Sequence, residues 1–266
     1  MRTSEQLKSI VKEAYANIAR QSASGCGCSC DCGDGGGLGI DYSNVDGHYA
    51  GADLGLGCGI PTQFTQIAEG NVVLDLGSGA GNDVFVARSI VGEQGKVIGV
   101  DMTEEMVARA QQNQAKLGYQ NVDFRLGDIE KLPVSTDETD VVISNCVLNL
   151  VPDKRKAFQE IYRVLKPGGH FCISDIVLRG ELPKKLKDMA ALYAGCVAGA
   201  VEREEYLQII QETGFVDTEV KQAQQIVFSD AFLAEYLTEA EFEAYRSSNN
   251  GLLSITVSGK KPVDTE

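Results

Sequence analysis

The chain lacks several features that mark whole classes of protein. Among its 266 residues there is no tryptophan and there are only two histidines, and no apolar run approaches the length of a membrane span. A transmembrane helix needs about 20 consecutive apolar residues, and a signal peptide needs a basic and then an apolar N-terminal region, and neither pattern is present. We therefore expect a cytoplasmic protein with no membrane partner.

Basic residues are also in short supply. The 24 Lys and Arg residues are outnumbered by 38 Asp and Glu residues, which gives a formal charge of -14. A chain this acidic repels a phosphate backbone unless it has a local basic strip, and none is found, so nucleic acid is not an expected partner. The composition, 43% hydrophobic and 23% charged, is typical of a soluble globular protein. The length allows one large α/β domain, with or without a small appendage.

Cysteine, by contrast, is abundant, with eight residues. In a reducing compartment this number is more typical of ligands, nucleophiles or redox thiols than of structural disulfides. Cys26, Cys28, Cys30 and Cys32 alternate within a glycine-rich segment, a spacing that differs from the paired ligands of zinc fingers. Capture of a soft metal, disulfide exchange and simple low complexity are all left open for this segment.

A strand that breaks into a glycine-rich turn organises the chain. Four apolar residues in five over Val72–Leu76 predict a buried strand, and the alternating Gly77, Gly79 and Gly81 let a backbone approach a ligand closely. A predicted helix follows, so the segment has the form of the first unit of a nucleotide-type α/β site. A dinucleotide fingerprint places its third glycine where this chain has Asn82, which argues against NAD.

Acidic side chains end three successive predicted strands. Asp75 precedes the glycine loop, where it would repel a pyrophosphate but suits the ammonium group of an amino-acid ligand. Asp101 ends a strand over 96–100, at a position where a carboxylate can accept both ribose hydroxyls. Asp128 follows a third strand over 122–126. One such acid is commonly a helix cap or a solvated turn residue, whereas three in succession indicate a ligand site.

The pattern Asp75-x-Gly77-x-Gly79-x-Gly81 resembles motif I of the class I S-adenosylmethionine (SAM) methyltransferases. The resemblance implies a Rossmann-like α/β fold with a mostly parallel seven-stranded sheet, helices on both faces, an N-terminal helix and a C-terminal extension. It also implies SAM as cofactor, with Asp128 contacting the adenine. The cofactor-binding residues implied in this way are Asp75, Gly77, Ser78, Gly79, Gly81, Asp101, Met102, Asp128, Ile129 and Asn145.

The rest of the chain predicts the remaining elements of such a fold. We divide it into an N-terminal helix with a Cys/Gly-rich segment (1–66), a SAM-binding α/β core (67–180) and a substrate-binding C-terminal region that completes the sheet (181–266). The first helix is expected over 3–22, opened by a capping box at Thr3–Gln6. Later predicted elements are a strand from Asp140, a turn over 166–169, helices over 153–165, 183–200 and 202–213, strands over 170–178, 216–228 and 252–260, and a helical region over 230–246.

Three further cysteines lie on separate segments around the predicted cofactor: Cys58, Cys146 and Cys196. Cys58 stands between two glycines, which predicts an unshielded thiol, whereas Cys172 lies inside an apolar strand and is expected to be a core residue. The stretches Leu-Gly-Leu-Gly-Cys58-Gly, Ser-Asn-Cys146-Val-Leu-Asn and Ala-Gly-Cys196-Val-Ala-Gly resemble the three cysteine motifs of the arsenite methyltransferases.

The resemblance implies that Cys58, Cys146 and Cys196 are the catalytic thiols and the As(III) ligands of an arsenic-detoxifying enzyme. The implied substrate is arsenite or its thiol conjugate, and the implied reductant, which resets a disulfide between active-site cysteines, is thioredoxin or glutathione. Three convergent thiolates can hold soft As(III) with its lone pair facing outward, and this lone pair needs no general base. His48 and His170 are accordingly expected to be structural.

Two other functions are left open by the residues. One is a SAM-dependent methyltransferase of a small organic acceptor such as a quinone, in which the cysteines are incidental. The other is a thiol-based protein that sequesters a metal or metalloid on a methyltransferase scaffold.

Overall fold

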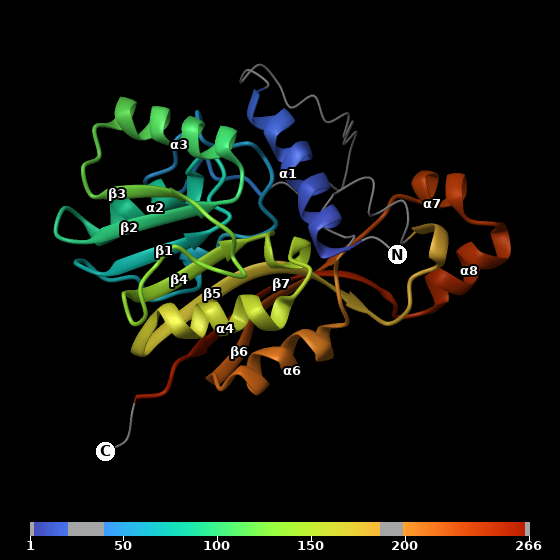
Figure 1. The fold of residues 1–266 in the computed structure, drawn as a ribbon. Coiled ribbons are helices and arrows are strands. Elements are labelled where there is room, and N and C mark those ends of the chain that lie inside the picture. The colour runs from blue at the N-terminus through green and yellow to red at the C-terminus, as the bar shows by residue number, and fades with distance from the viewer. Residues whose placement is uncertain (1–2, 21–39, 187–198, 264–266) are drawn as a thin grey trace.

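The protein is built on one seven-stranded sheet of order β3-β2-β1-β4-β5-β7-β6, in which β7 runs antiparallel to both of its neighbours (Figure 1). The structure is a computed structural model and describes residues 3–20, 40–186 and 199–263. The other strands are parallel, which confirms the predicted α/β fold with its mostly parallel sheet. The strands are β1 Val72–Leu76, β2 Lys96–Asp101, β3 Val122–Leu126, β4 Thr139–Asn145, β5 Leu165–Arg179, β6 Val216–Ile226 and β7 Gly251–Lys260.

Helices cover both faces of the sheet, because successive side chains of a buried strand point to opposite sides. Val73 of β1 packs in a core with Phe85 of α2, whereas Leu74 packs in a second core with Phe158 of α4. Helices α2 and α3 therefore cover one face, and α4 and α6 cover the other. The helices are α1 Ser4–Arg20, α2 Asn82–Val91, α3 Glu104–Leu117, α4 Lys154–Val164, α6 Arg203–Thr213, α7 Asp230–Tyr236 and α8 Glu239–Ser247.

Strand β1 lies at the point where the strand order reverses, with β2 on one side and β4 on the other. In open α/β sheets the crevice beyond the carboxyl ends of such strands is where ligands bind. The segments that follow β1, β2 and β4 therefore meet at one edge of the sheet.

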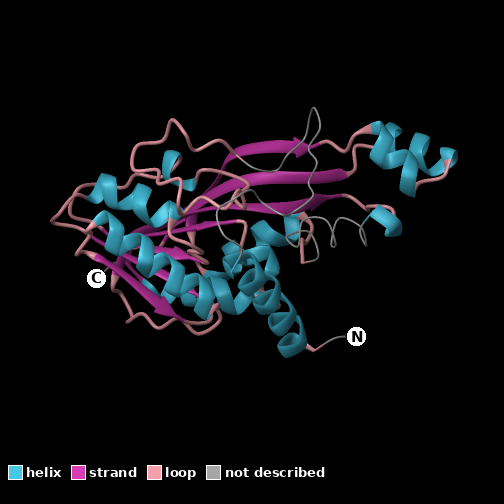
Figure 2. Cartoon of the chain, turned by 90° about the horizontal axis from the view of Figure 1, so that it is seen from above, coloured by secondary structure: helices cyan, strands magenta, loops and turns pink. Residues whose placement is uncertain are grey.

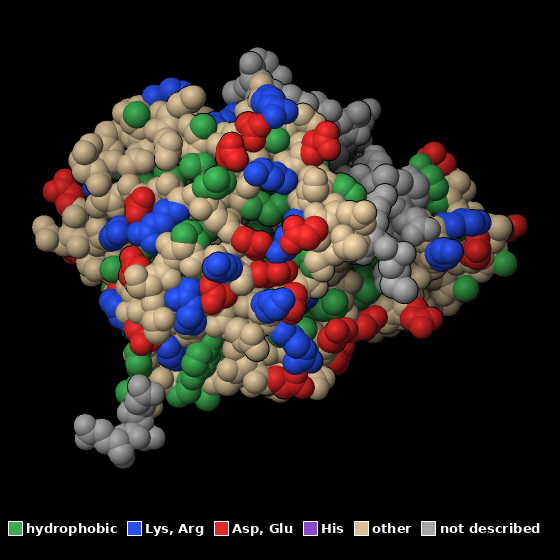
Figure 3. Space-filling view, viewed as in Figure 1, with side chains coloured by type: hydrophobic (Ala, Val, Ile, Leu, Met, Phe, Trp, Pro, Cys, Tyr) green, Lys and Arg blue, Asp and Glu red, His purple; other side chains and the backbone are tan. Residues whose placement is uncertain are grey.

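Helix α1 lies across this edge and packs against α3. Its predicted capping box is confirmed, because the Gln6 backbone N–H donates to Thr3 Oγ1 (3.3 Å) and the Thr3 N–H donates to Gln6 Oε1 (2.9 Å). Lys8 Nζ extends from α1 to the segment that follows β3, where it donates to Asp128 Oδ2 (2.6 Å) and Glu130 Oε2 (2.7 Å). Figure 3 shows basic and acidic side chains interspersed over the face on which α1 lies. Within the described ranges, the helices are too short or too polar to cross a membrane.

The structure corrects the predicted start of the fifth strand. Strand β5 begins at Leu165 rather than at His170, because the residues predicted as a turn stay attached to the chain beyond β7. The Gly168 N–H donates to Lys261 O (3.0 Å), and the Lys261 N–H donates to Gly169 O (2.8 Å). A register shift on the β4 side of the ladder accommodates this irregular stretch.

The C-terminal predictions also need correction. The region 230–246 forms two helices, because Thr238 and Glu241 make a capping box that starts α8 anew. Together α7 and α8 lie beyond the ends of the long strands, away from α2 and α3 (Figures 1 and 2). Strand β6 ends at Ile226, two residues before its predicted end. Of the helix predicted over 183–200, residues 184–186 are helical, and 187–198 lie outside the described residues.

Candidate active site

A pocket opens where the loops after β1, β2 and β4 meet under α1. Nine of the ten predicted cofactor-binding residues line it: Asp75, Gly77, Ser78, Gly79, Asp101, Met102, Asp128, Ile129 and Asn145. Gly81 has a different role. It begins α2 with φ +98°, and a Cβ there would lie 2.9 Å from both Phe85 and Phe124. This glycine therefore allows the helix to pack closely on the sheet.

The glycine loop leaves unsatisfied polar atoms at the pocket. Gly77 and Gly79 have positive φ values, and the Gly79 N–H donates to Asp101 Oδ2 (3.0 Å). Ser78 Oγ and Asn82 Oδ1 are buried and have no hydrogen-bond partner among the described residues. Buried polar atoms are normally satisfied, so this loop is built to contact a polar ligand. The arrangement fits the ribose and amino-acid ends of SAM.

Three carboxylates line the same pocket, those of Asp75 and Asp83, which are buried, and that of Asp101, which is partly buried. Burial, together with the negative charges of Asp83 and Asp101, raises the pKa of Asp75 well above its ordinary value. Burial likewise raises the pKa of Asp83 to about 6, although hydrogen bonds from Asn145 and Tyr42 oppose the shift. The basic side chain among the lining residues, Lys8, is paired with Asp128 and Glu130. The cluster of Asp75, Asp83 and Asp101 therefore favours a cationic ligand, and SAM carries a sulfonium and an ammonium group.

The affinity for SAM is expected to fall as the pH is lowered below about 6, the raised pKa of Asp83 in the free protein. A cationic ligand binds the ionised carboxylates, which exist above their pKa, so binding near this pH must release protons. Calorimetric titrations from about pH 5 to pH 7, where the SAM ammonium stays protonated, in two buffers of different ionisation enthalpy, measure both effects. Asp83→Asn should lose much of the proton release. A Kd that does not change over this range would contradict the prediction.

Sequence reasoning missed Asp83 and Tyr42 as parts of this site. The Tyr42 hydroxyl lies 2.9 Å from both Asp83 Oδ1 and Gly59 O, and it is itself buried. An acid in the first turn of a helix is commonly explained by the helix dipole, so Asp83 gave no distinct signal. Tyr42 comes from a segment before the first strand, and no local pattern connects it to the pocket.

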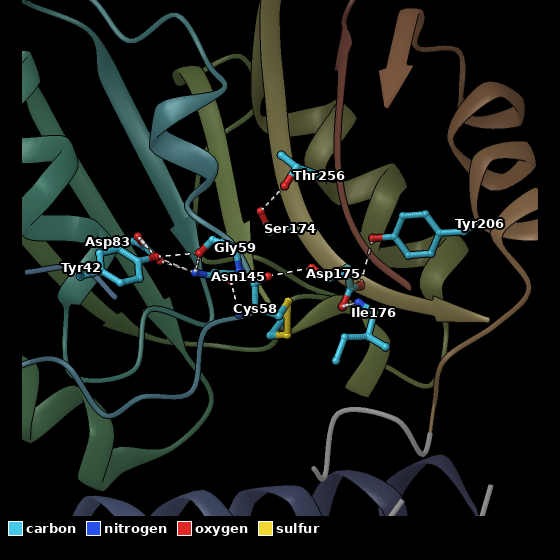
Figure 4. Close-up of a disulfide and its surroundings, with 12 residues drawn as sticks. Tyr42, Cys58, Gly59, Asp83, Asn145, Ser174, Asp175, Ile176, Tyr206 and Thr256 are labelled. Atoms are coloured by element: carbon cyan, nitrogen blue, oxygen red, sulfur yellow. Dashed lines mark hydrogen bonds between the residues drawn. A yellow bond between two sulfur atoms is a disulfide. The ribbon is translucent and has the colours of Figure 1, made fainter. Parts of the chain in front are cut away.

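Two of the three predicted thiol residues are joined in the structure. Cys58 and Cys146 form a disulfide across 88 residues of sequence, with their Cα atoms 5.7 Å apart (Figure 4). Cys146 also lines the pocket. Cys196 lies outside the described residues, as do Cys26, Cys28, Cys30 and Cys32. In this oxidised form the two sulfur atoms cannot act as thiolate ligands, so any thiol chemistry must follow reduction.

The loop that carries Cys58 is packed tightly against the sheet. Cys58 is 4% exposed, so the expectation of an unshielded thiol is wrong. Its glycine neighbours serve close approach instead: a Cβ on Gly59 would lie 2.3 Å from Ser174 Oγ. Ser254 Oγ donates to Cys58 O (2.7 Å), which ties the loop to β7. Cys146 has a left-handed backbone with φ +59° and donates its N–H to Ser174 O (2.8 Å).

Apolar side chains surround the disulfide. Ile176, Leu178 and Leu252 form a buried cluster with the two cysteines, and Phe228 packs against it. The remaining described cysteine, Cys172, is a free thiol buried in β5, where burial raises its pKa to about 12. This confirms the prediction that it is a core residue.

Each of the two histidines lies beside a side-chain oxygen atom, of Asp53, which lines the pocket, or of Thr65, which does not. His48 Nε2 is 3.2 Å from Asp53 Oδ2, and His170 Nε2 is 2.7 Å from Thr65 Oγ1. Neither histidine is among the residues that line the pocket.

A family model described as a methyltransferase domain matches residues 67–214. Together with the strand order and the pocket at the glycine loop, this match defines the chain as a class I SAM-dependent methyltransferase.

Comparison with individual proteins identifies the family of methyltransferases to which the chain is similar. The chain is 40% identical to an arsenite methyltransferase of Halobacterium salinarum, over 98% of this chain and 68% of that protein. It is 37% identical to the arsenite methyltransferase of Homo sapiens, over 70% of this chain and 52% of that protein. It is also similar to the crystal structure of CrArsM, an arsenic(III) S-adenosylmethionine methyltransferase from Chlamydomonas reinhardtii, with 34% identity and a TM-score of 0.63 over 79% of this chain and 69% of that chain.

The chain belongs to the arsenite methyltransferase family. It spans about two thirds of the Halobacterium relative and about half of the human one.

Proposed function

We propose that this chain transfers a methyl group from SAM to trivalent arsenic held by the thiolates of Cys58, Cys146 and Cys196, as part of arsenic detoxification. The observation that carries the proposal is the pairing of Cys58 with Cys146 beside the cofactor pocket. A bond between sulfur atoms so far apart in sequence requires that the fold bring both side chains to one place. Membership of the family supports arsenite, or its thiol conjugate, as the substrate.

The proposed catalytic cycle begins with reduction of the disulfide between Cys58 and Cys146. A dithiol, or two monothiols, gives two electrons and two protons to Cys58 and Cys146 and becomes a disulfide itself. Each protein thiol that then replaces a hydroxyl of arsenite passes its proton to the departing oxygen, so water leaves. Soft As(III) prefers thiolate to water or carboxylate, and the apolar cluster beside Cys58 and Cys146 limits competition by solvent.

The cofactor pocket is proposed to be formed by the nine predicted residues that line it, with Asp101 accepting the ribose hydroxyls and Asp128 contacting the adenine. When bound, the cofactor supplies a methyl group on positively charged sulfur, which suits the outward lone pair of arsenic. Asp75 would hold the ammonium end, because its carboxylate has no hydrogen-bond donor in the described part of the chain and lies at the head of the glycine loop.

The regions of the chain follow from these roles. We assign residues 1–66 to helix α1, the Cys/Gly-rich segment and Cys58, 67–180 to the SAM-binding core, and 181–266 to the substrate side of the pocket and completion of the sheet. Gain of a methyl cation formally oxidises arsenic, so repeated cycles need two electrons each time. We propose thioredoxin or glutathione as the source of these electrons, and a reducing compartment such as the cytoplasm as the location of the protein.

The assay that tests this function combines the full chain with arsenite, SAM and a dithiol reductant. Methylated arsenicals, detected by chromatography with arsenic-specific mass spectrometry, are expected with reductant, and essentially none are expected without it. Arsenic that binds but is never methylated would support the sequestering alternative. Failure of both binding and methylation would favour a small organic acceptor.

A further inference from the structure

Asn145 makes five hydrogen bonds that join the two cysteine segments to the cofactor pocket (Figure 4). Its side-chain oxygen accepts the backbone N–H groups of Cys58 (3.0 Å) and Gly59 (3.2 Å). Its side-chain nitrogen donates to Gly59 O (2.7 Å), to Tyr42 Oη (2.8 Å) and to Asp83 Oδ2 (3.1 Å). Cys146 is the next residue in the chain. The Asn145 side chain therefore binds the loop of one cysteine, while its backbone is joined directly to the other cysteine.

The orientation of this amide is fixed by its surroundings. Reversing it would place an oxygen against Gly59 O and the Asp83 carboxylate, and would place N–H groups against the N–H groups of Cys58 and Gly59. Space is equally restricted, because a Cβ on Gly57 would lie 2.7 Å from Asn145 Nδ2. The amide therefore has one arrangement, and that arrangement needs the Cys58 loop in place.

These contacts fill the capacity of the side chain. An amide oxygen has two lone pairs and an NH2 group has two donors. Two protein donors occupy the oxygen, and three protein acceptors share the nitrogen. Although Asn145 lines the pocket, its side chain has no donor or acceptor left for the cofactor.

We propose that Asn145 is a positioning residue for the thiol pair, and that it holds Cys58 against Cys146 rather than binding the cofactor through its side chain. The inference rests on the proposed thiol chemistry of these two cysteines. Fixing two thiols side by side raises their effective concentration toward each other and so favours the disulfide. In the opposite direction, a dithiol loses two electrons and two protons as Cys58 and Cys146 gain them.

The decisive measurement is the disulfide equilibrium of the full chain in a dithiothreitol redox buffer. Alkylation and peptide mass spectrometry report the fraction of Cys58 joined to Cys146. Asn145→Ala is expected to shift this equilibrium toward the free thiols by roughly tenfold, or ~30 mV for a two-electron couple. Asn145→Asp keeps an acceptor for the two N–H groups but places an oxygen against Gly59 O and the Asp83 carboxylate, so we expect an intermediate shift of about threefold.

Two controls separate positioning from general damage and from cofactor binding. Ser144→Ala removes a buried bond to Leu76 O (3.0 Å) from the same strand without touching the Cys58 loop, and should leave the equilibrium within about twofold of the parent. Asp101→Asn should weaken SAM binding without moving the disulfide, whereas Asn145→Ala should move the disulfide and weaken SAM binding less than Asp101→Asn does.

The reverse pattern, a large loss of SAM affinity in Asn145→Ala with an unchanged disulfide, would overturn the proposal. An equal shift in Ser144→Ala, or in Asn145→Asp and Asn145→Ala alike, would also overturn it. Should Asn145→Ala fail to fold, the comparison of Asn145→Asp with Ser144→Ala decides, because a shift confined to Asn145→Asp supports positioning and no shift refutes it. No arsenic is present in these measurements, so they are independent of the methylation assay.

Discussion

Cys146→Ser is expected to lower the rate of arsenite methylation by at least ~10³-fold, or about 4 kcal/mol of transition-state stabilisation. A hydroxyl is a hard oxygen donor that As(III) does not prefer over water. With one thiolate ligand lost, the arsenic is no longer held next to the methyl group of the cofactor. The backbone N–H of residue 146 keeps its bond to Ser174 O, so the loop itself should persist. Arsenic speciation after single-turnover reaction gives the rate, and calorimetry gives the Kd for SAM, which should change by less than about threefold.

The matched control is Cys172→Ala. Cys172 is a buried free thiol on β5, directly across the ladder from Ile143 of β4, and it lies outside the pocket. This variant should keep most of the methylation activity after correction for any loss of folded protein. Full activity in Cys146→Ser, or equal losses in both variants, would show that the Cys146 thiolate is not a ligand of the arsenic.

Asp101→Ala should raise the Kd for SAM roughly 30- to 150-fold, or about 2–3 kcal/mol. The carboxylate is placed to accept a ribose hydroxyl, and it also accepts the backbone N–H groups of Gly79 (3.0 Å) and Thr103 (2.8 Å). Removing it takes away a charge-assisted acceptor and leaves the Gly79 N–H of the cofactor loop unsatisfied. Equilibrium binding of SAM and of S-adenosylhomocysteine measures the effect without any methyl transfer.

Asp123→Ala serves as the comparison for this loss. Asp123 lies on the neighbouring strand β3, pairs with Arg125 at 2.8 Å and is partly exposed outside the pocket. Surface ion pairs contribute little, so its removal should change the Kd for SAM by less than about twofold. If Asp101→Ala binds SAM as tightly as Asp123→Ala does, the cofactor does not lie where the three acids meet.

The sequence predicted the parts of the fold that depend on short-range patterns. The run Val72–Leu76 predicts a buried strand from its own apolar residues, and the turn that follows requires the glycines for its backbone conformation. The expected carboxylates Asp75 and Asp101 line the pocket because parallel strands place their carboxyl ends at one edge. The predicted element boundaries were wrong where a segment distant in sequence makes the hydrogen bonds. Residues 166–169 predict a turn from their own sequence, but they bond to Lys261 and stay attached to the sheet.

The sequence by itself determined the class I methyltransferase fold, the glycine loop and the segments that carry the candidate thiols, because each is encoded within a few consecutive residues. Tertiary structure alone decided that Cys58 is buried, that it lies bonded to Cys146, and that Asn145 grips its loop while touching Asp83. These facts depend on segments 62 to 88 residues apart, which meet only when β1 and β4 pair in one sheet. Local propensity carries no information about such meetings, since they are fixed by the packing of the whole chain.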